Sequence, residues 1–366
     1  MSSARAAVLV HGATGFTGKL VAATLVARGI PIAVAGRSRE KLDTLVAALG
    51  NDAIESVVVD IRDSRSVEAA LEGRKVVCAC AGPFLEVGEP VVAAAAKLGV
   101  HYADTTGEQT FVANAKDRHD ALAKTKNACV VPAMAYEIAV ADWAAHLAAE
   151  KVGGDPDSIA VAYLLKTPEG GMQGATSRGT KLSMIAMTAD GSAQQFVAGR
   201  LVDEKSATHV RSFRAPSGRE IWCASFPSPE AIVVPGHTGA KNVRTFMSFG
   251  KSAAKAMQLT RSVTPFFMKL AKKPLTKLVE RSSAGPEGGD RHARFDVVAE
   301  ATKGSITERV VLSGSDPYGL TAEIQALFVE AALAGKLAHT GVVGPSLAVG
   351  PNEGIAALAK LGLTMS

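Results

Sequence analysis

Three glycines near the N-terminus form the clearest pattern in this sequence that could do chemistry. Gly12, Gly15 and Gly18 have the spacing GxxGxxG, directly after a short apolar run and at the start of an amphipathic segment. Between a strand and a helix, such glycines allow a tight turn, close approach of the backbone to a diphosphate, and close helix packing. We predict a dinucleotide-binding loop with contacts from Gly12, Thr14, Gly15, Phe16, Thr17 and Gly18. A tight turn that binds nothing is the alternative.

Two residues after the second apolar run indicate which dinucleotide is bound. About 20 residues beyond the last glycine, an enzyme that uses NAD usually carries an acidic residue for the ribose 2′-hydroxyl. This sequence has Arg37 and Ser38 there instead. A guanidinium group and a hydroxyl suit a 2′-phosphate. The pattern therefore predicts NADP(H), with a solvated surface charge as the alternative for Arg37.

Two further groups of residues follow predicted strands. Asp60 ends the third strand and is predicted to lie near the adenine. Ala81, Gly82 and Pro83 follow the fourth strand, where a small residue and a rigid turn would admit the nicotinamide and its ribose. Ligands of such folds bind outside the carboxyl ends of the strands. We therefore assign these four residues to the cofactor site.

The candidate catalytic residue is Tyr136. Hydride transfer requires a proton donor near the atom that gains negative charge. None of the four tyrosines has the lysine four residues later that short-chain carbonyl reductases use. Tyr136 follows the sixth predicted strand, with Glu137 and Asp142 nearby in the sequence. Packing at a domain interface is the alternative for Tyr136.

The elements that must position these residues follow a simple alternation. Short apolar runs alternate with amphipathic segments, which is typical of βαβ units in a parallel sheet. The predicted strands are 6–10, 32–35, 56–59, 76–80, 101–104 and 128–131, with helices such as 19–28 and 39–49 between them. The predicted fold class is α/β, with an N-terminal doubly wound parallel sheet of the Rossmann type.

A second domain of mixed α+β structure is expected after the break at 153–156. Strands are predicted at 159–165, 231–234 and 294–299, and helices at 183–187 and 322–334. We expect a dinucleotide-binding domain over 1–150 and a substrate and dimerisation domain over 151–320. A C-terminal helix and tail over 321–366 would return to the first domain.

Charge is concentrated in one segment of the chain. The 366 residues carry a formal net charge of +5, yet segment 251–281 alone has eight Lys and Arg residues against Glu280. Phe266, Phe267 and Leu270 can share one helical face there. An ordinary surface helix is one interpretation. The others are a lid over a lipophilic substrate, contact with an acidic acyl carrier, and peripheral contact with an anionic membrane.

Composition excludes several classes of protein. Hydrophobic residues make up 47% of the chain, which is too much for a disordered protein. The four cysteines form no pattern typical of zinc ligands, so we expect no metal. The first residues do not resemble a signal peptide, and no apolar run is long enough to span a membrane. We expect a cytoplasmic homodimer that does not bind nucleic acid.

The sequence resembles the saccharopine dehydrogenase-like oxidoreductases, and within them the group of trans-acting enoyl reductases. The matching stretches are GATGFTGKL, AGRSREKL, AGPFLEVGEPVV and HYADTTGEQTF, which begin at Gly12, Ala35, Ala81 and His101. Weaker similarity includes Asp316, Pro317 and Tyr318, whereas the loop after the sixth predicted strand departs from the usual pattern.

The resemblance implies an NADPH-dependent oxidoreductase that reduces a conjugated C=C bond in a small-molecule or carrier-linked acyl substrate. Reduction of a C=N bond, as by saccharopine or opine dehydrogenases, is an alternative. A non-catalytic NADP-binding regulator is a third interpretation.

Overall fold

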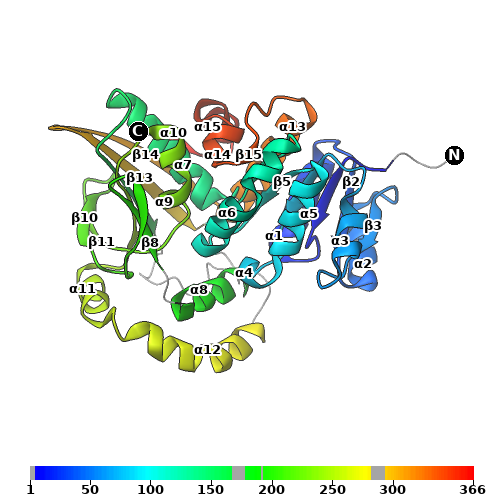
Figure 1. The fold of residues 1–366 in the computed structure, drawn as a ribbon, viewed down its shortest axis with the longest axis horizontal. Helices are drawn as coiled ribbons and strands as arrows, with labels where there is room; N and C mark the ends of the chain where they lie inside the picture. The colour runs from blue at the N-terminus through cyan, green and yellow to red at the C-terminus, as the bar shows by residue number, and fades with distance from the viewer. Residues whose placement is uncertain (1–4, 167–177, 191–192, 282–292) are drawn as a thin grey trace. The chain divides into compact units, whose positions relative to one another are not determined.

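The computed structural model describes residues 5–166, 178–190, 193–281 and 293–366, which form two compact units (Figure 1). The first unit contains residues 1–106, 111–136 and 318–349, and the second contains 107–110, 137–317 and 350–366. Each unit is built on one β-sheet.

The sheet of the first unit is parallel throughout and has seven strands in the order β15-β6-β5-β4-β1-β2-β3. The strand order reverses between β1 and β4, which defines the switch point of a doubly wound sheet. The six predicted strands and the predicted fold class are therefore confirmed. The strands are β1 (Val8–His11), β2 (Ile32–Gly36), β3 (Glu55–Val58), β4 (Val76–Ala79), β5 (His101–Asp104), β6 (Cys129–Val131) and β15 (Gly341–Val342).

The helices between these strands begin and end at residues suited to those positions. Ser38 and Asp63 cap two of them by accepting hydrogen bonds from backbone N–H groups, and Gly50 ends the first of these in the left-handed conformation. The helices are α1 (Phe16–Ala27), α2 (Arg39–Leu49), α3 (Ser64–Leu71), α4 (Phe84–Val87), α5 (Glu89–Leu98), α6 (Gln109–Thr125), α13 (Pro317–Leu333) and α14 (Pro345–Ala348).

The core of the first unit consists of aliphatic and aromatic side chains. Leu9, Val77, Val92, Tyr102 and Phe111 are all at most 2% exposed. All residues of β1, β2 and β4 are buried, as expected for a parallel sheet with both faces covered. Packing on both faces of the sheet therefore fixes the positions of the carboxyl ends of these strands.

The second unit has a mixed sheet of nine strands, with the path β10-β11-β12-β7-β13-β14-β16, in which β8 pairs with β12 and β9 pairs with β8. Strands β12 and β7 are parallel, and the other pairs are antiparallel. The strands are β7 (Ser158–Lys166), β8 (Gln194–Val197), β9 (Arg200–Asp203), β10 (Val210–Arg214), β11 (Glu220–Ser225), β12 (Val243–Ser248), β13 (Arg294–Lys303), β14 (Ile306–Ser315) and β16 (Thr364–Met365).

One predicted strand of the second unit is wrong, because residues 231–234 lie in and directly after a short helix. Pro229 is the N-cap of this helix, and Pro235 begins the next one. A short buried apolar run has no periodicity that separates strand from helix. The helices are α7 (Tyr136–Lys151), α8 (Arg178–Asp190), α9 (Glu230–Val233), α10 (Pro235–Thr238), α11 (Lys251–Thr260), α12 (Thr264–Glu280) and α15 (Pro351–Ala359).

Two other predicted helices of the chain are confirmed, within α8 and α13. The helix predicted at 322–334 is not the last one, because α14 and α15 follow it. Among the described helices, none is long and apolar enough to cross a bilayer.

Candidate functional site

The glycine loop after β1 leaves no room for side chains at two of its three glycines. Gly12 has a φ of +74°, and a Cβ atom there would lie 2.7 Å from the backbone nitrogen of Ala81. A Cβ atom at Gly18 would lie 2.3 Å from the carbonyl oxygen of Gly12. The turn after β1 thus meets the turn after β4 at the switch point of the sheet.

The first turn of α1 can receive an anion. Gly15 is its N-cap without a side-chain hydrogen bond, and the first turn contains no acidic residue. The first backbone N–H groups of a helix have no partner within the helix and carry a partial positive charge. Together with the closed glycine turn, these groups fit the diphosphate of a dinucleotide.

Arg37 and Ser38 stand where β2 ends. Arg37 is exposed, and its guanidinium forms no ion pair with any part of the chain that the structure describes. The Ser38 hydroxyl accepts a hydrogen bond of 3.4 Å from the Lys41 N–H and so caps α2. Thr14 is close to this strand end, because its Oγ1 lies 3.7 Å from the point where a Cβ atom would stand if Gly36 carried a side chain. Arg37 is therefore available to an anion, and the Ser38 hydroxyl retains its proton as a donor.

Asp60 and the segment Ala81 to Pro83 occupy the neighbouring strand ends. The Asp60 carboxylate accepts hydrogen bonds of 3.0 Å from both Nε and the backbone N–H of Arg62, and these bonds lower its pKa. The peptide bond between Gly82 and Pro83 is cis. The partner of Asp60 in the structure is thus Arg62. The place of Asp60 near the adenine stays a prediction.

One aromatic residue near the glycine loop was not predicted. The ring of Tyr318, at the start of α13, lies edge-on to the ring of Phe16, with centroids 5.1 Å apart. Tyr318 belongs to the weakly matching stretch at 316–318. A contact between residues about 300 positions apart gives no local signal in the sequence, so only the resemblance could have indicated it.

Tyr136 is the first residue of α7. Its backbone N–H donates to Oγ1 of Thr321 over 3.1 Å. About one turn of helix away along α13, the Gln325 amide donates to the carbonyl oxygens of Asp104, at the end of β5, and of Met134, after β6. Helix α13 thus connects Tyr136 to the carboxyl ends of two strands of the parallel sheet.

The second unit contains a connected row of titratable side chains that was not predicted from the sequence. Oδ1 of Asp142 lies 2.6 Å from Nε2 of His237, and both side chains are at most 1% exposed. Nδ1 of His237 lies 3.0 Å from Nδ1 of His146. Nε2 of His146 lies 3.5 Å from the exposed Glu150. Burial alone would lower the pKa of His237, but the charge and hydrogen bond of the Asp142 carboxylate outweigh this effect and raise its pKa above the usual value.

Two glutamates of the second unit also have strongly altered pKa values. Glu230 in α9 is fully buried, and neither carboxyl oxygen has a hydrogen-bond partner among the residues that the structure describes. Burial raises its pKa well above the usual range, and the charges of Asp142 and Glu137 raise it further. Burial also raises the pKa of Glu137 to about 7. The second unit therefore holds two carboxyl groups that can carry a proton near neutral pH, one of them next to Tyr136 in the sequence.

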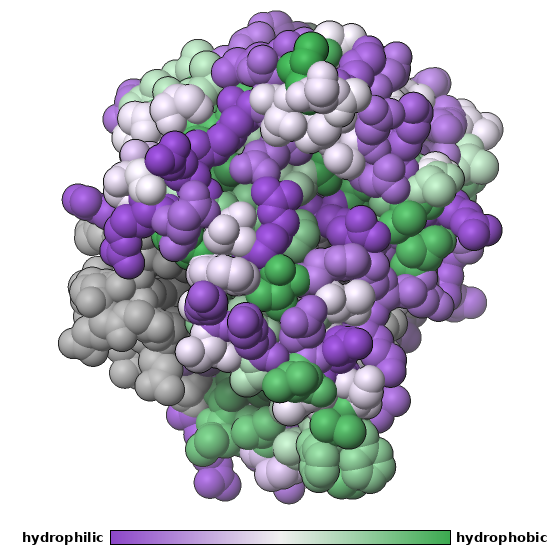
Figure 2. Space-filling model, turned by 90° about the vertical axis from the view of Figure 1, so that its left-hand side faces the viewer, coloured by the Kyte–Doolittle hydropathy of each residue, from purple (hydrophilic) through white to green (hydrophobic). Residues whose placement is uncertain are grey.

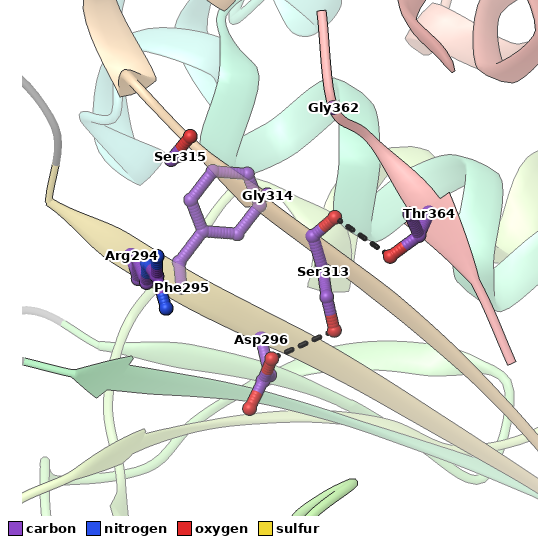
Figure 3. A pocket seen from close by; sticks show the side chains of 8 residues that line it. All are labelled: Arg294, Phe295, Asp296, Ser313, Gly314, Ser315, Gly362 and Thr364. Atoms are coloured by element: carbon purple, nitrogen blue, oxygen red, sulfur yellow. Dashed lines mark hydrogen bonds between the residues drawn. The ribbon is translucent and has the colours of Figure 1, made fainter.

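A separate pocket of about 300 Å³ lies at the edge of the mixed sheet, between β13, β14 and the segment around β16 (Figure 3). Its polar groups are largely engaged with one another, because Ser313 donates to Oδ1 of Asp296 over 2.7 Å and Thr364 donates to the Ser313 carbonyl. None of the predicted site residues lines it. We therefore assign no catalytic role to this pocket.

Comparison with known proteins identifies the first unit. Residues 8–137 match the family described as the saccharopine dehydrogenase NADP binding domain. This part of the chain is similar to that family, and the match supports both the resemblance seen in the sequence and NADP(H) as the cofactor.

The curated relatives match less than half of the chain. A trans-acting enoyl reductase of Mycobacterium leprae is 37% identical over 139 residues, which cover 37% of this chain and 33% of that protein. A putative trans-acting enoyl reductase of Mycobacterium tuberculosis is 33% identical over 178 residues, which cover 46% of this chain and 42% of the relative. The matches thus span between one third and one half of the relatives.

The fold extends the similarity to both units. The apo saccharopine dehydrogenase (L-Glu forming) of Saccharomyces cerevisiae superposes with a TM-score of 0.63, covering 98% of this chain and 99% of that chain at 14% identity. At this identity the likeness concerns the fold alone. It confirms the combination of a Rossmann-type unit with a second mixed unit.

Proposed function

We propose that this protein is an oxidoreductase that uses NADPH to reduce a conjugated C=C bond of an acyl substrate attached to a carrier. The observation that carries the proposal is the closed glycine turn at the switch point, beside an exposed Arg37 in place of an acidic residue. The relatives named as trans-acting enoyl reductases support the substrate class and the type of bond.

The chain's own residues have separate roles in holding the cofactor. The backbone of Gly12, Gly15 and Gly18 and the first turn of α1 bind the diphosphate. Arg37 and Ser38 bind the 2′-phosphate, because a guanidinium group offers paired donors to phosphate oxygens. Thr14, Phe16 and Thr17 complete this loop, Asp60 lies toward the adenine, and Ala81, Gly82 and Pro83 leave space for the nicotinamide.

The reaction also requires a proton at the carbon next to the carbonyl. When bound, NADPH supplies the hydride for the other carbon of the double bond. We propose Tyr136 as the residue that donates the proton from its hydroxyl oxygen. Burial raises the pKa of Glu137, its neighbour in the sequence, to about 7, so this carboxyl group is suited to exchange a proton near neutral pH.

The test of this function compares three classes of substrate with the purified protein and NADPH. We expect NADPH oxidation with a carrier-linked 2-enoyl thioester, and no oxidation with a 2-oxo acid plus an amine. Oxidation only with the 2-oxo acid and amine would indicate reduction of a C=N bond. Binding of NADPH without turnover of enoyl, imine or carbonyl substrates would indicate a regulator.

Replacing Tyr136 tests the proton donor. We expect Tyr136→Phe to lower kcat by about 100-fold, since general acid catalysis contributes roughly that much, while NADPH affinity stays unchanged. Phe removes only the hydroxyl group and keeps the packing of the ring. Unchanged kcat would show that Tyr136 takes no part in the reaction.

A further inference from the structure

Helix α12 exposes an unusual amount of apolar surface. Phe266 and Phe267 are 63% exposed, and Leu270 and Leu278 are 67% exposed. Leu259, near the end of α11, is 84% exposed. In Figure 2, apolar side chains gather at the lower edge of the visible face, at the height of α11 and α12 in Figure 1. Clustered exposed apolar side chains of this size indicate a surface that contacts something else.

The exposed residues are not the face by which α12 packs on its own unit. Helix α12 contacts α8, and the residues Met268, Leu275 and Val279 on one side of α12 are half-buried. At 100° per residue, Phe266 and Leu270 lie on the opposite side of the helix, and Leu278 lies on one flank of it. An ordinary surface helix has one apolar stripe, directed at the core. Helix α12 has a second apolar stripe directed away from it.

Basic residues border this outward stripe. Lys269, Lys273 and Lys277 follow each other at intervals of four, so they form a row along the helix, and all three are exposed. Segment 251–281 carries eight cationic side chains and one anionic side chain, although the whole chain has a net charge of only +5. The positive charge of the protein is therefore concentrated where the apolar stripe lies.

We propose that α12, together with Leu259 of α11, lies in the plane of a bilayer that contains anionic lipids and holds this protein at the membrane surface. A helix of 17 residues offers a contact of about 25 Å. Amphipathic helices of this kind bury their aromatic and aliphatic side chains at the level of the headgroups. Lysines along the border keep their ammonium groups in the headgroup layer, near lipid phosphates.

Two other binding partners, a second copy of the chain and an acidic carrier protein, would match only part of this surface. A second copy of the chain, related by a twofold axis through α12, would bring two basic rows together. An acidic carrier protein would pair with the lysines, but charge pairing alone does not require five exposed aromatic and aliphatic side chains. An anionic bilayer matches both the stripe and its basic border.

The experiment measures co-flotation of the full-length protein with phosphatidylcholine vesicles, with or without phosphatidylglycerol. We expect binding to the mixed vesicles and little to phosphatidylcholine alone. The variant Phe266→Ser/Phe267→Ser should reduce binding by about 100-fold, because it removes two large apolar side chains. The variant Lys269→Glu/Lys273→Glu/Lys277→Glu should reduce binding by at least about 100-fold, at roughly fivefold for each lysine lost.

A matched control separates local contact from net charge. Lys126→Glu/Lys336→Glu/Lys360→Glu makes the same change in net charge at exposed lysines outside the segment. We expect this control to bind within a few-fold of the original protein. All substituted side chains are exposed, and unchanged far-UV circular dichroism would verify the fold of each variant.

Three outcomes would overturn the proposal. Equal losses in the control and the α12 charge variant would indicate a general effect of charge. Vesicle binding that survives the loss of both phenylalanines would exclude insertion of the stripe. Absence of vesicle binding, with α12 variants that lose affinity for an acidic acyl carrier or that dissociate a dimer, would assign the surface to a protein partner.

Discussion

The two units of this protein arrange their chemically important groups in different ways. In the first unit, the cofactor loop consists of backbone atoms that glycines allow to approach closely, as at Gly12 and Ala81. In the second unit, the notable groups are buried titratable side chains, such as Asp142, His237 and Glu230. The first arrangement depends on the absence of side chains, and the second on side chains that stabilise one another's charge.

This difference predicts different responses to substitution. A Cβ atom in the glycine loop collides with backbone that cannot move away without distorting a strand end. A lost partner in the second unit leaves a buried charge, whose cost depends on pH. The following substitutions test the contrast, beginning with the largest expected effect.

The largest effect is expected from Gly12→Ala. The new Cβ atom would lie 2.7 Å from the Ala81 backbone nitrogen, in addition to the strain of a φ of +74°. We expect a loss of about 5 kcal/mol in the free energy of unfolding and loss of NADPH binding. Urea denaturation and cofactor titration would measure both.

Gly29→Ala is the matched control for this substitution. Gly29 has a φ of +71°, but a Cβ atom there meets nothing within 4 Å. It should therefore cost only about 1 kcal/mol, from backbone strain alone. Similar losses in the two variants would show that the close approach to Ala81 contributes nothing.

A somewhat smaller effect is expected from His237→Leu. This change removes the imidazole partner of the buried Asp142 carboxylate and should lower the free energy of unfolding at neutral pH by about 4 kcal/mol. Part of the loss should be recovered as the pH falls and Asp142 takes up a proton. Chemical denaturation at several pH values would measure this.

The control for His237 is a more exposed contact between a histidine and a carboxylate. His209 lies 3.0 Å from Glu204, and its side chain is 43% exposed. His209→Leu should cost less than about 1 kcal/mol. If the two histidine variants lose equal stability, burial of the Asp142 pair has no special energetic role.

The pH dependence of stability tests a buried histidine in the first unit. Nδ1 of His11 has no partner among the described residues, and burial lowers the pKa of His11 from 6.5 to about 4. Between these values the unfolded chain binds a proton that the folded chain does not. The free energy of unfolding should therefore fall by about 3 kcal/mol from this group as the pH decreases from 6.5 to 4.

His11→Gln isolates this contribution. As the pH decreases from 6.5 to 4, the free energy of unfolding should fall less in the variant than in the original protein. Denaturation curves above pH 6.5 and near pH 4 give this difference directly. A constant difference across this range would show that His11 titrates normally in the folded state.

The sequence predicted what depends on local spacing. The six strands of the parallel sheet, the glycine turn and the helices predicted at 19–28 and 39–49 all follow from patterns of a few residues, although the first of these helices begins three residues earlier, at Phe16. The same holds for the amphipathic helix that includes Phe266. In each case the information lies within about ten neighbouring positions, which is the range that periodicity and capping describe.

The sequence did not predict groups assembled from distant parts of the chain. His237 meets Asp142 across 95 positions, and Tyr318 meets Phe16 across about 300 positions. The sequence predicts a strand where the helix at Ala231 lies, because a run of four apolar residues shows no period. Such features depend on tertiary packing, so a single sequence gives no signal for them.

The most direct test of the central claim is a titration of the original protein and Arg37→Asp with NADPH and with NADH. A carboxylate at this position repels the 2′-phosphate and can accept a hydrogen bond from a ribose hydroxyl. We predict that Arg37→Asp weakens NADPH binding by about 100-fold and leaves NADH binding within a few-fold. Equal weakening of both cofactors would contradict the role of Arg37 and the basis for an NADPH-dependent reductase.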